Sequence, residues 1–115
     1  MPTGSSSAIA GTGLATAALG VSVAAGNIAN ALTPAYAPSR VEQSELQDGG
    51  VSGQVVKARD PLAEVRADRA LLAGNGVDLA QEIVTQMTAA RTFEANLKSA
   101  QTSFDLEGEL IKALK

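Results

Sequence analysis

The chain has 115 residues, a formal net charge of −3, and neither cysteine nor histidine. These counts exclude disulfides, thiolate zinc sites and the side chain that most often acts as a general base near neutral pH. The negative charge also argues against nucleic acid as a partner, since phosphate binding needs a basic surface. Only Tyr36, Phe93 and Phe104 are aromatic and alanine is abundant, so we expect close helix packing in place of a deep core.

All charged residues follow Ser39, which raises the possibility of a signal peptide or a membrane span near the N-terminus. A signal peptide needs a basic leading region, and residues 1–7 contain none. A spanning helix needs about 20 strongly apolar residues, whereas residues 8–32 are mostly Ala, Gly, Ser, Thr and Asn. We therefore expect no cleaved signal peptide and no membrane insertion.

The first predicted element is a helix from about Ala8 to Ala31. The serines at positions 5–7 can cap its free N–H groups, and Thr33-Pro34 is expected to stop it. Apolar residues recur along it with the 4-3 spacing of a coiled-coil seam. The seam positions are Ala10, Leu14, Ala17, Val21, Ala24, Ile28 and Ala31.

A middle segment, residues 35–76, follows this helical arm of residues 1–34. Arg40–Leu46 and Val51–Ala58 have the composition of strands, and the Gln47-Asp48-Gly49-Gly50 turn between them predicts a hairpin. Residues 62–72 fit either a short helix or an irregular strap. Gly74-Asn75-Gly76 marks a break before the next element.

The C-terminal arm, residues 77–115, is predicted to be one long helix from about Asp78 to Leu114. Asp78 and Gln81 have the spacing of a capping box. The predicted seam is Leu79, Ile83, Gln86, Ala90, Phe93, Leu97, Ala100, Phe104, Glu107, Ile111 and Leu114. The predicted fold is therefore mainly α: two long helices packed antiparallel as one coiled-coil domain, with a short β-rich segment between them.

Both arms carry short motifs. The N-terminal arm has Thr12-Gly13-Leu14, then Ala25-Gly26-Asn27-Ile28-Ala29-Asn30, then Thr33-Pro34-Ala35-Tyr36. The C-terminal arm has Val77-Asp78-Leu79, then Glu82, then Arg91-Thr92-Phe93-Glu94-Ala95-Asn96. In order and position these motifs resemble the two terminal signatures of the flagellar axial family, which comprises rod, hook and hook-associated proteins. Gly26, Leu32, Ala35 and Gly76 depart from the usual family residues.

The resemblance implies a structural subunit of the bacterial flagellar basal-body rod, most like the small proximal-rod type. Such subunits stack helically into a hollow tube that transmits torque and conducts exported subunits. They leave the cell through the flagellar type III export apparatus and assemble in the periplasm with other rod and hook subunits. The matching motif residues are Gly13, Asn27, Ile28, Ala29, Asn30, Thr33, Pro34, Tyr36, Asp78, Glu82, Arg91, Phe93 and Asn96.

Several roles stay open at this point. The large seam residues are expected to pack in the core and to form the assembly seam: Leu14, Val21, Ile28, Leu79, Ile83, Ala90, Phe93, Leu97, Phe104 and Ile111. Asn27 and Asn30 either cap the helix end or bond to the other arm or a neighbouring subunit. Arg91, Glu94 and Asn96 either face solvent or touch another subunit. The glycines at positions 11, 13, 20 and 26 either fray the helix or permit close backbone approach.

The sequence contains few of the groups that enzymes use in catalysis. The candidate acids are Asp60, Asp68, Asp78, Glu82, Asp105, Glu107 and Glu109, and none belongs to a phosphate-loop or metal-ligand motif. We therefore predict that the chain is not an enzyme and has no cofactor or metal. The alternatives are a needle or inner-rod subunit of a virulence-type III secretion system, a small coiled-coil adaptor, and an amphipathic membrane-active peptide.

Overall fold

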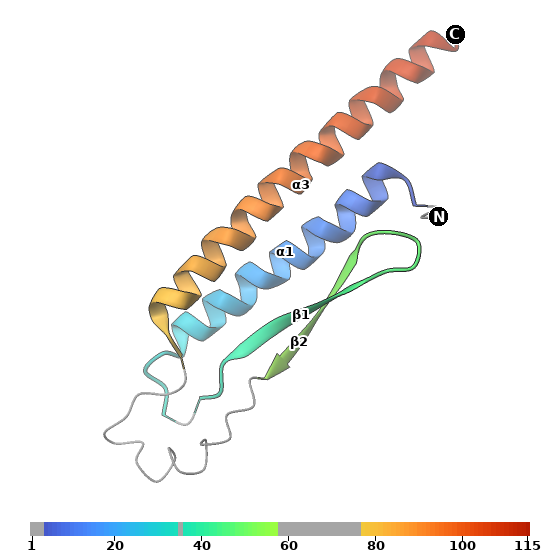
Figure 1. Cartoon of the computed structure of the whole chain (residues 1–115). Coiled ribbons are helices and arrows are strands. Elements are labelled where there is room, and N and C mark those ends of the chain that lie inside the picture. The colour runs from blue at the N-terminus through green and yellow to red at the C-terminus, as the bar shows by residue number, and fades with distance from the viewer. Residues whose placement is uncertain (1–3, 35, 58–76) are drawn as a thin grey trace.

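The computed structural model describes residues 4–34, 36–57 and 77–115. Within them the chain forms helix α1 (Ser6–Ala29), strands β1 (Ser39–Glu45) and β2 (Val51–Lys57), and helix α3 (Leu79–Ala113) (Figure 1). The molecule is elongated, with extents of 71 × 24 × 14 Å. The predicted mainly α fold with a two-stranded hairpin is confirmed. The segment 62–72 and the glycine-rich break after it lie outside the described residues.

Polar caps define the ends of α1. Ser5 is its N-cap, and the Ser5 hydroxyl accepts a hydrogen bond from the backbone N–H of Ala8 at 3.2 Å. The helix ends at Ala29, and the N–H of Asn30 donates to the carbonyls of Gly26 and Asn27. The helix therefore ends before the predicted stop at Thr33-Pro34, because the chain already turns at Asn30.

Helix α3 begins as its sequence predicts. Asp78 is the N-cap, and its carboxylate accepts a hydrogen bond from the N–H of Gln81 at 3.1 Å. Glu82 in the first turn is negatively charged and Lys112 in the last turn is positively charged, and the helix dipole favours both placements.

The hairpin is antiparallel, with Ser39 paired to Lys57 and Glu45 paired to Val51. Gly49 and Gly50 occupy its turn with φ angles of 88° and 98°, a region in which a side chain is strained and glycine is not. The turn is closed by a hydrogen bond from the N–H of Leu46 to the carbonyl of Gly50 at 3.1 Å. The two glycines therefore fix where the strands reverse.

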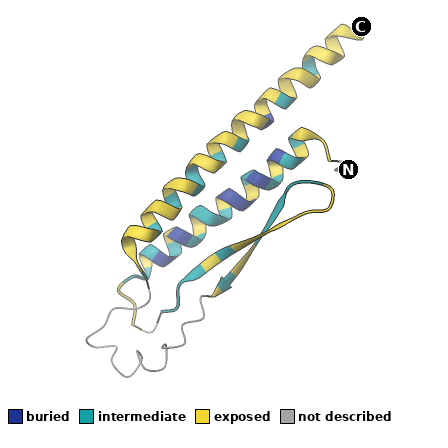
Figure 2. Ribbon diagram, in the orientation of Figure 1, coloured by how far each residue is buried: buried dark blue, intermediate teal, exposed yellow. Residues whose placement is uncertain are grey.

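Helix α1 is the central element, with α3 on one side and the hairpin on the other (Figures 1 and 2). Most of the buried positions lie on it, as Figure 2 shows. The buried hydrophobic residues among those described are all alanines: Ala10, Ala17, Ala24 and Ala100. Each buries little apolar area, so the chain's own core contributes little hydrophobic stabilisation.

By length and composition alone, α1 is apolar enough to cross a membrane, and no other helix among the described residues is. In the structure α1 packs against α3 and both strands.

The two helices differ in length, so one end of α3 has no helical neighbour in the chain. Gly13 lies against Asn96 and Gly20 against Ala89; continuing this antiparallel pairing places Ser6 opposite Ser103. Residues 104–114 therefore extend past the end of α1 (Figure 1). We call this segment the overhang.

Candidate assembly surfaces

The two helices meet along rows of mostly small residues, here called the contact row. An added Cβ on Gly13 would lie 2.5 Å from Oδ1 of Asn96, and one on Gly20 would lie 3.2 Å from the Cβ of Ala89. The α1 side comprises Ala10, Gly13, Ala17, Gly20, Ala24 and Asn27; the α3 side comprises Glu82, Gln86, Ala89, Phe93, Asn96, Ala100 and Ser103. Gly13 and Asn96 belong to the motifs of opposite arms, and the fold brings them into contact.

The large predicted seam residues lie beside this row. Leu14 follows Gly13 by one residue, and Leu97 follows Asn96 by one residue. One residue turns a helix by about 100°, and in an antiparallel pair the same step in both helices leads to the same side. We call this side the open flank: Leu14, Val21, Ile28, Ile83, Ala90, Leu97 and Phe104.

The open flank is incompletely covered within the chain. Ile83, Leu97 and Phe104 are 49%, 41% and 60% exposed, while Leu14, Val21, Ile28 and Ala90 are half-buried. Core packing was expected for the larger of these side chains. The structure differs because close approach of the helices requires the glycines and alanines of the contact row, which leaves the larger side chains at the edge. Leu79 and Ile111 of the predicted seam are also exposed, whereas Phe93 is half-buried in the row.

Asn27 holds the connection between α1 and β1. Its side chain is fully buried and donates to the carbonyl of Ser39 at 2.8 Å. Its Oδ1 accepts from the N–H of Ser39 at 2.9 Å and from the hydroxyl of Tyr36 at 3.0 Å. Two motif residues, Asn27 and Tyr36, therefore act together to fix the loop that carries the chain from helix to hairpin.

The remaining N-terminal motif residues lie around the same loop. The Asn30 amide donates to the carbonyl of Gly26 at 2.9 Å, which is a helix-end cap. The Thr33 hydroxyl donates to Oδ1 of Asn30 at 3.2 Å. Pro34 and Ala29 are exposed, and Ile28 belongs to the open flank.

On α3, Arg91 and Glu94 are exposed, whereas Asn96 is half-buried in the contact row. The Asn96 amide also donates to the carbonyl of Thr92 at 2.9 Å. Asp78 caps the helix, and Glu82 lies in its first turn.

Thr12 anchors the hairpin to α1, a role that sequence reasoning missed. Its hydroxyl donates to the carbonyl of Ile9 at 2.7 Å and accepts from the N–H of Val51 at 3.1 Å. The missing Cβ of Gly50 is what lets the turn approach Thr12 closely. A threonine pair at positions 12 and 16, on the side of the helix away from the predicted seam, is the sequence signal that could have indicated this contact.

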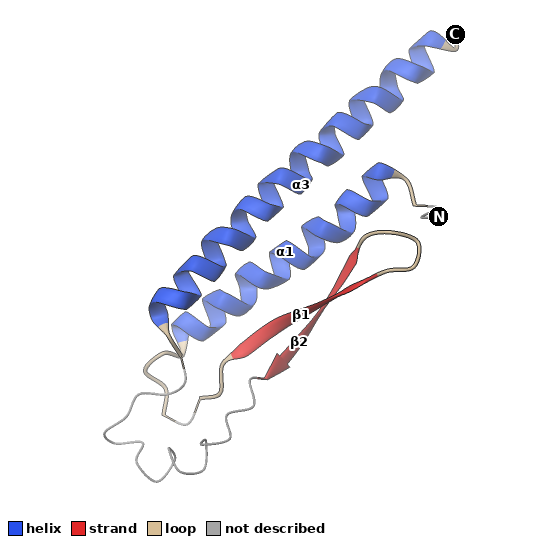
Figure 3. Cartoon of the chain, viewed as in Figure 1, coloured by secondary structure: helices blue, strands red, loops and turns tan. Residues whose placement is uncertain are grey.

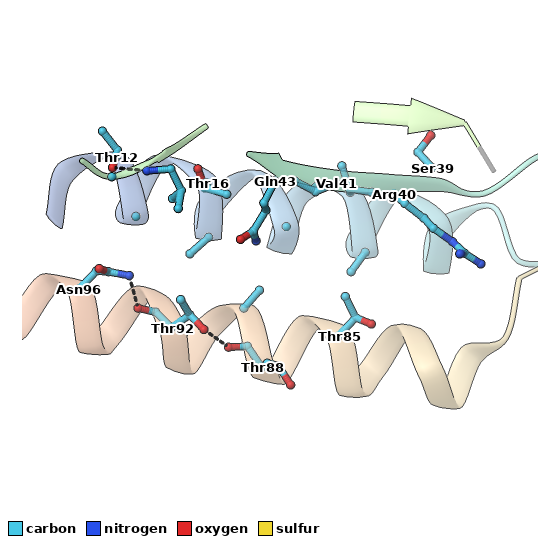
Figure 4. Close-up of a pocket in the computed structure, with 18 of the residues that line it drawn as sticks. Thr12, Thr16, Ser39, Arg40, Val41, Gln43, Thr85, Thr88, Thr92 and Asn96 are labelled. Carbon is cyan, nitrogen blue, oxygen red and sulfur yellow. Dashed lines mark hydrogen bonds between the residues drawn. The ribbon is translucent and has the colours of Figure 1, made fainter. Parts of the chain in front are cut away.

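On the flank opposite the open one lies a groove of about 570 Å³, here called the hairpin groove (Figure 4). Its floor is the small-residue face of α1, including Gly13, Ala17, Gly20 and Ala24. One wall is α3, where Thr85, Thr88, Thr92 and Asn96 lie in series; the other is β1, with Arg40, Val41 and Gln43 (Figure 4). Residues 4–34, 36–57 and 77–115 contain no cluster of three or more potential metal ligands.

An antiparallel helix pair that leaves an apolar flank uncovered offers a surface on which another chain can pack. Residues 70–113 match the family model of the flagellar basal body rod FlgEFG protein C-terminal region. The match covers the C-terminal arm, where it confirms the resemblance to the flagellar rod family that the motifs predict, and it supports a structural role in the flagellar basal body. A comparison with curated proteins found no match.

Proposed function

We propose that the chain is a structural subunit of the flagellar basal-body rod, and that it assembles helically into a hollow tube. The observation that carries the proposal is the open flank, whose α3 residues lie within the part of the chain that matches the rod family. A contiguous row of large apolar side chains is costly to leave in water and usually marks an interaction surface. Burial of this row between subunits would supply the stabilisation that the chain's alanine core lacks.

The proposed assembly seam consists of the open flank together with Leu79, Phe93 and Ile111. A contact between two different surfaces of the same chain need not close on itself, so it can be repeated along a filament. Each contact can be weak because it recurs at every subunit. By the family resemblance, the terminal helices would line the inner wall and the hairpin would face outward.

The role of such a tube is mechanical, without a cofactor: it transmits torque and conducts unfolded subunits that are exported later. We propose export through the flagellar type III apparatus without a cleaved signal peptide, followed by assembly in the periplasm with other rod and hook subunits. A small alanine core suits this route, since a chain that threads a narrow channel must unfold readily.

Electron microscopy of isolated basal bodies tests the proposal. A short epitope inserted after Gln47, an exposed residue of the hairpin turn, leaves both helices intact. A gold-labelled antibody should mark the periplasmic rod, and the tagged chain should restore swimming to a deletion strain. An untagged chain is the control for labelling.

Each alternative has its own outcome. Label on a needle complex would indicate the virulence-type secretion role, and label confined to the cytoplasm would indicate an adaptor. Binding of the purified chain to liposomes, with no label in basal bodies, would indicate the membrane-active peptide. Any of these results would overturn the rod proposal.

A further inference from the structure

The contact row of α3 continues beyond the end of α1, at the same spacing, as Glu107, Leu110 and Leu114. Leu110 and Leu114 are 61% and 79% exposed on the overhang, whereas Glu82 and Gln86, at the other end of the row, are half-buried beside α1. Burial of apolar side chains is favourable and burial of polar ones is costly. In the observed register, α1 therefore covers the more polar end of the row and leaves the more apolar end in water.

Seven residues separate the two glycines of the contact row, Gly13 and Gly20. Gly13 lies against Asn96, and a Cβ added to it would approach the Asn96 amide to 2.5–2.7 Å. If α1 were shifted by seven residues toward the C-terminus of α3, Gly20 would take this place. A shift of one helical turn in either direction would instead bring Ala10 or Ala17, each with a Cβ, against Asn96. The shift by one heptad is the smallest that keeps a glycine opposite the amide.

The open flank repeats with the same period. Its α1 members, at positions 14, 21 and 28, are seven residues apart, and so are its α3 members, at positions 83, 90, 97 and 104. In the structure Leu14 lies beside Leu97, next to the contact of Gly13 with Asn96. After a shift by one heptad Leu14 would lie beside Phe104, which is 60% exposed in the observed register. Each α1 member of the flank would therefore still meet an apolar residue of α3.

The hairpin is fastened to α1 and not to α3 (Figure 1). The hydroxyl of Thr12 and the amide of Asn27 bind the starts of the two strands, and the N–H of Gly4 donates to the carbonyl of Asp48 in the turn at 3.1 Å. No Cα of either strand lies within 8 Å of a Cα of α3. Within residues 4–34, 36–57 and 77–115, the side-chain hydrogen bonds of α3 stay inside that helix. Helix α1 and the hairpin can therefore move along α3 as one body.

We propose that α1 and the hairpin occupy a second register on α3, shifted by one heptad toward its C-terminus, and that Glu107 sets the balance between the two registers. Seven residues correspond to about 10 Å along the helix axis. Residues 58–76 join the hairpin to α3, and a chain of this length reaches about 60 Å, so the connection permits the shift. The inference concerns a single chain and does not rest on the proposed function.

Glu107 opposes the second register. It would lie against Ala10, in the place that Ala100 holds in the structure, and burial of an unpaired carboxylate is costly. Helix α1 contains no charged residue that could pair with it. The observed register leaves Glu107 in water but leaves Leu110 there as well. These opposing effects bring the two registers close in free energy.

The shift changes how much apolar surface the chain offers to a neighbour. In the second register the start of α1, Ser6, lies opposite Leu110, and only residues 111–114 extend past it. Glu82 and Gln86 become exposed at the other end of α3. The device is therefore a subunit whose overhang has two lengths, set by the position of one rigid body on one helix.

Ala100 reports the register, because it faces a different alanine in each one. In the structure it shares the contact row with Ala10, and both are buried; in the second register it faces Ala17. The natural chain contains no cysteine. Oxidation of concentrated, helical protein should link Ala10→Cys to Ala100→Cys within one chain. Ala17→Cys should link to Ala100→Cys about tenfold more slowly, since this pair lies about 10 Å apart along the axis in the observed register, beyond disulfide reach.

Glu107→Leu should reverse the two rates, because the second register then buries an apolar side chain in place of a carboxylate. The Ala17→Cys pair should form about tenfold faster than in the parent, and the Ala10→Cys pair more slowly. Glu109→Leu is the matched control: it makes the same replacement on the charged face of the overhang, away from the contact row, and should leave both rates unchanged.

Spin labels measure the shift without a cross-link. Ala25 and Asp105 are exposed, and labels on cysteines at these positions would be about 32 Å apart along the axis in the observed register and about 21 Å apart in the second. Pulsed electron paramagnetic resonance should give two separate distances. The longer should dominate in the parent and the shorter in Glu107→Leu.

Three outcomes would overturn the proposal. One is a single long distance, with the Ala10→Cys pair still the faster to form, in Glu107→Leu. Another is a broad continuous distribution of distances, which would indicate fraying of the helices and not two registers. The third is an equal response to Glu107→Leu and Glu109→Leu, which would show that the lost charge acts without burial against Ala10. None of these results bears on whether the chain is found in the rod.

Discussion

Asn27 and Ser39 are joined by two hydrogen bonds between one side chain and one backbone unit, at 2.8 and 2.9 Å. The side chain lies at the end of α1 and the backbone at the start of β1. Because Asn27 is only 1% exposed, water does not replace these bonds if they break. The start of the hairpin is therefore held to the end of α1 by a single amide, whereas Thr12 holds the start of β2.

Asn27→Ala should detach the start of the hairpin from the helix. It removes three hydrogen bonds, including the one from Tyr36, at a cost of about 2–4 kcal/mol. Hydrogen exchange should become faster at Ser39 and along β1, while α3 changes little. Tyr36→Phe removes one of the three bonds and should cost about 1 kcal/mol. Equal losses in the two variants would show that the bonds to Ser39 contribute nothing.

The isolated chain should be only partly helical in dilute solution. Its described buried hydrophobic residues are four alanines, while thirteen large hydrophobic residues are exposed, and helices are marginal in water without packing. Circular dichroism should show well under half of the residues as helical, with helicity rising with protein concentration. A fully helical monomer that melts cooperatively at every concentration would contradict this prediction.

Leu97→Asp should abolish assembly while leaving expression and export intact. Leu97 is 41% exposed on the open flank, so the single chain tolerates the carboxylate, but burial between subunits would cost several kcal/mol. Swimming should be lost at a normal level of secreted protein. Ala95→Asp is the matched control: it adds the same charge to the same helix at an exposed position outside the open flank, and should swim. Normal swimming by Leu97→Asp would exclude this flank from the assembly seam.

Local features of the fold were predictable because the residues that cause them are adjacent in sequence. Ser5 and Asp78 cap the helices, and Gly49-Gly50 makes the turn. The contact row was predicted in part: the 4-3 spacing identifies Ala10, Ala17 and Ala24, which lie in the row, together with Leu14 and its equivalents, which lie beside it. The helices approach through the smaller residues one position earlier, such as Gly13, which hydrophobicity does not distinguish.

The candidate surfaces were predictable in part for a similar reason. The large seam residues were identified from their spacing, but their place on an uncovered flank depends on how α1 rotates against α3. The partners of Asn27 depend on the path of the chain after the helix, which brings Tyr36 and Ser39 back to it. The hairpin groove requires three elements to meet, so no local pattern could indicate it.

The glycines of α1 differ in what an added methyl group would meet, and this difference permits a graded test. Nothing lies within 4 Å of a Cβ built on Gly11; Gly20 would meet the Cβ of Ala89 at 3.2 Å, and Gly13 would meet the amide of Asn96 at 2.5–2.7 Å. Replacement by alanine gains about 1 kcal/mol of helix propensity at each position. Overpacking costs about 1–3 kcal/mol where space is lacking.

The net effect of each substitution on helicity and assembly should therefore follow the space around the glycine that is replaced. Gly11→Ala should raise helicity and support swimming, and Gly20→Ala should be tolerated, since Ala89 needs to move by only a few tenths of an ångström. Gly13→Ala should gain less helicity than Gly11→Ala, because the added methyl group must displace the Asn96 amide from the contact row. Gly20→Leu should block assembly, since a branched side chain would force the helices apart at every subunit. Circular dichroism and swimming, measured side by side for all four variants, test whether the helices meet through these glycines. If Gly13→Ala gains helicity as Gly11→Ala does, or Gly20→Leu swims like the parent, the helices do not meet through these glycines.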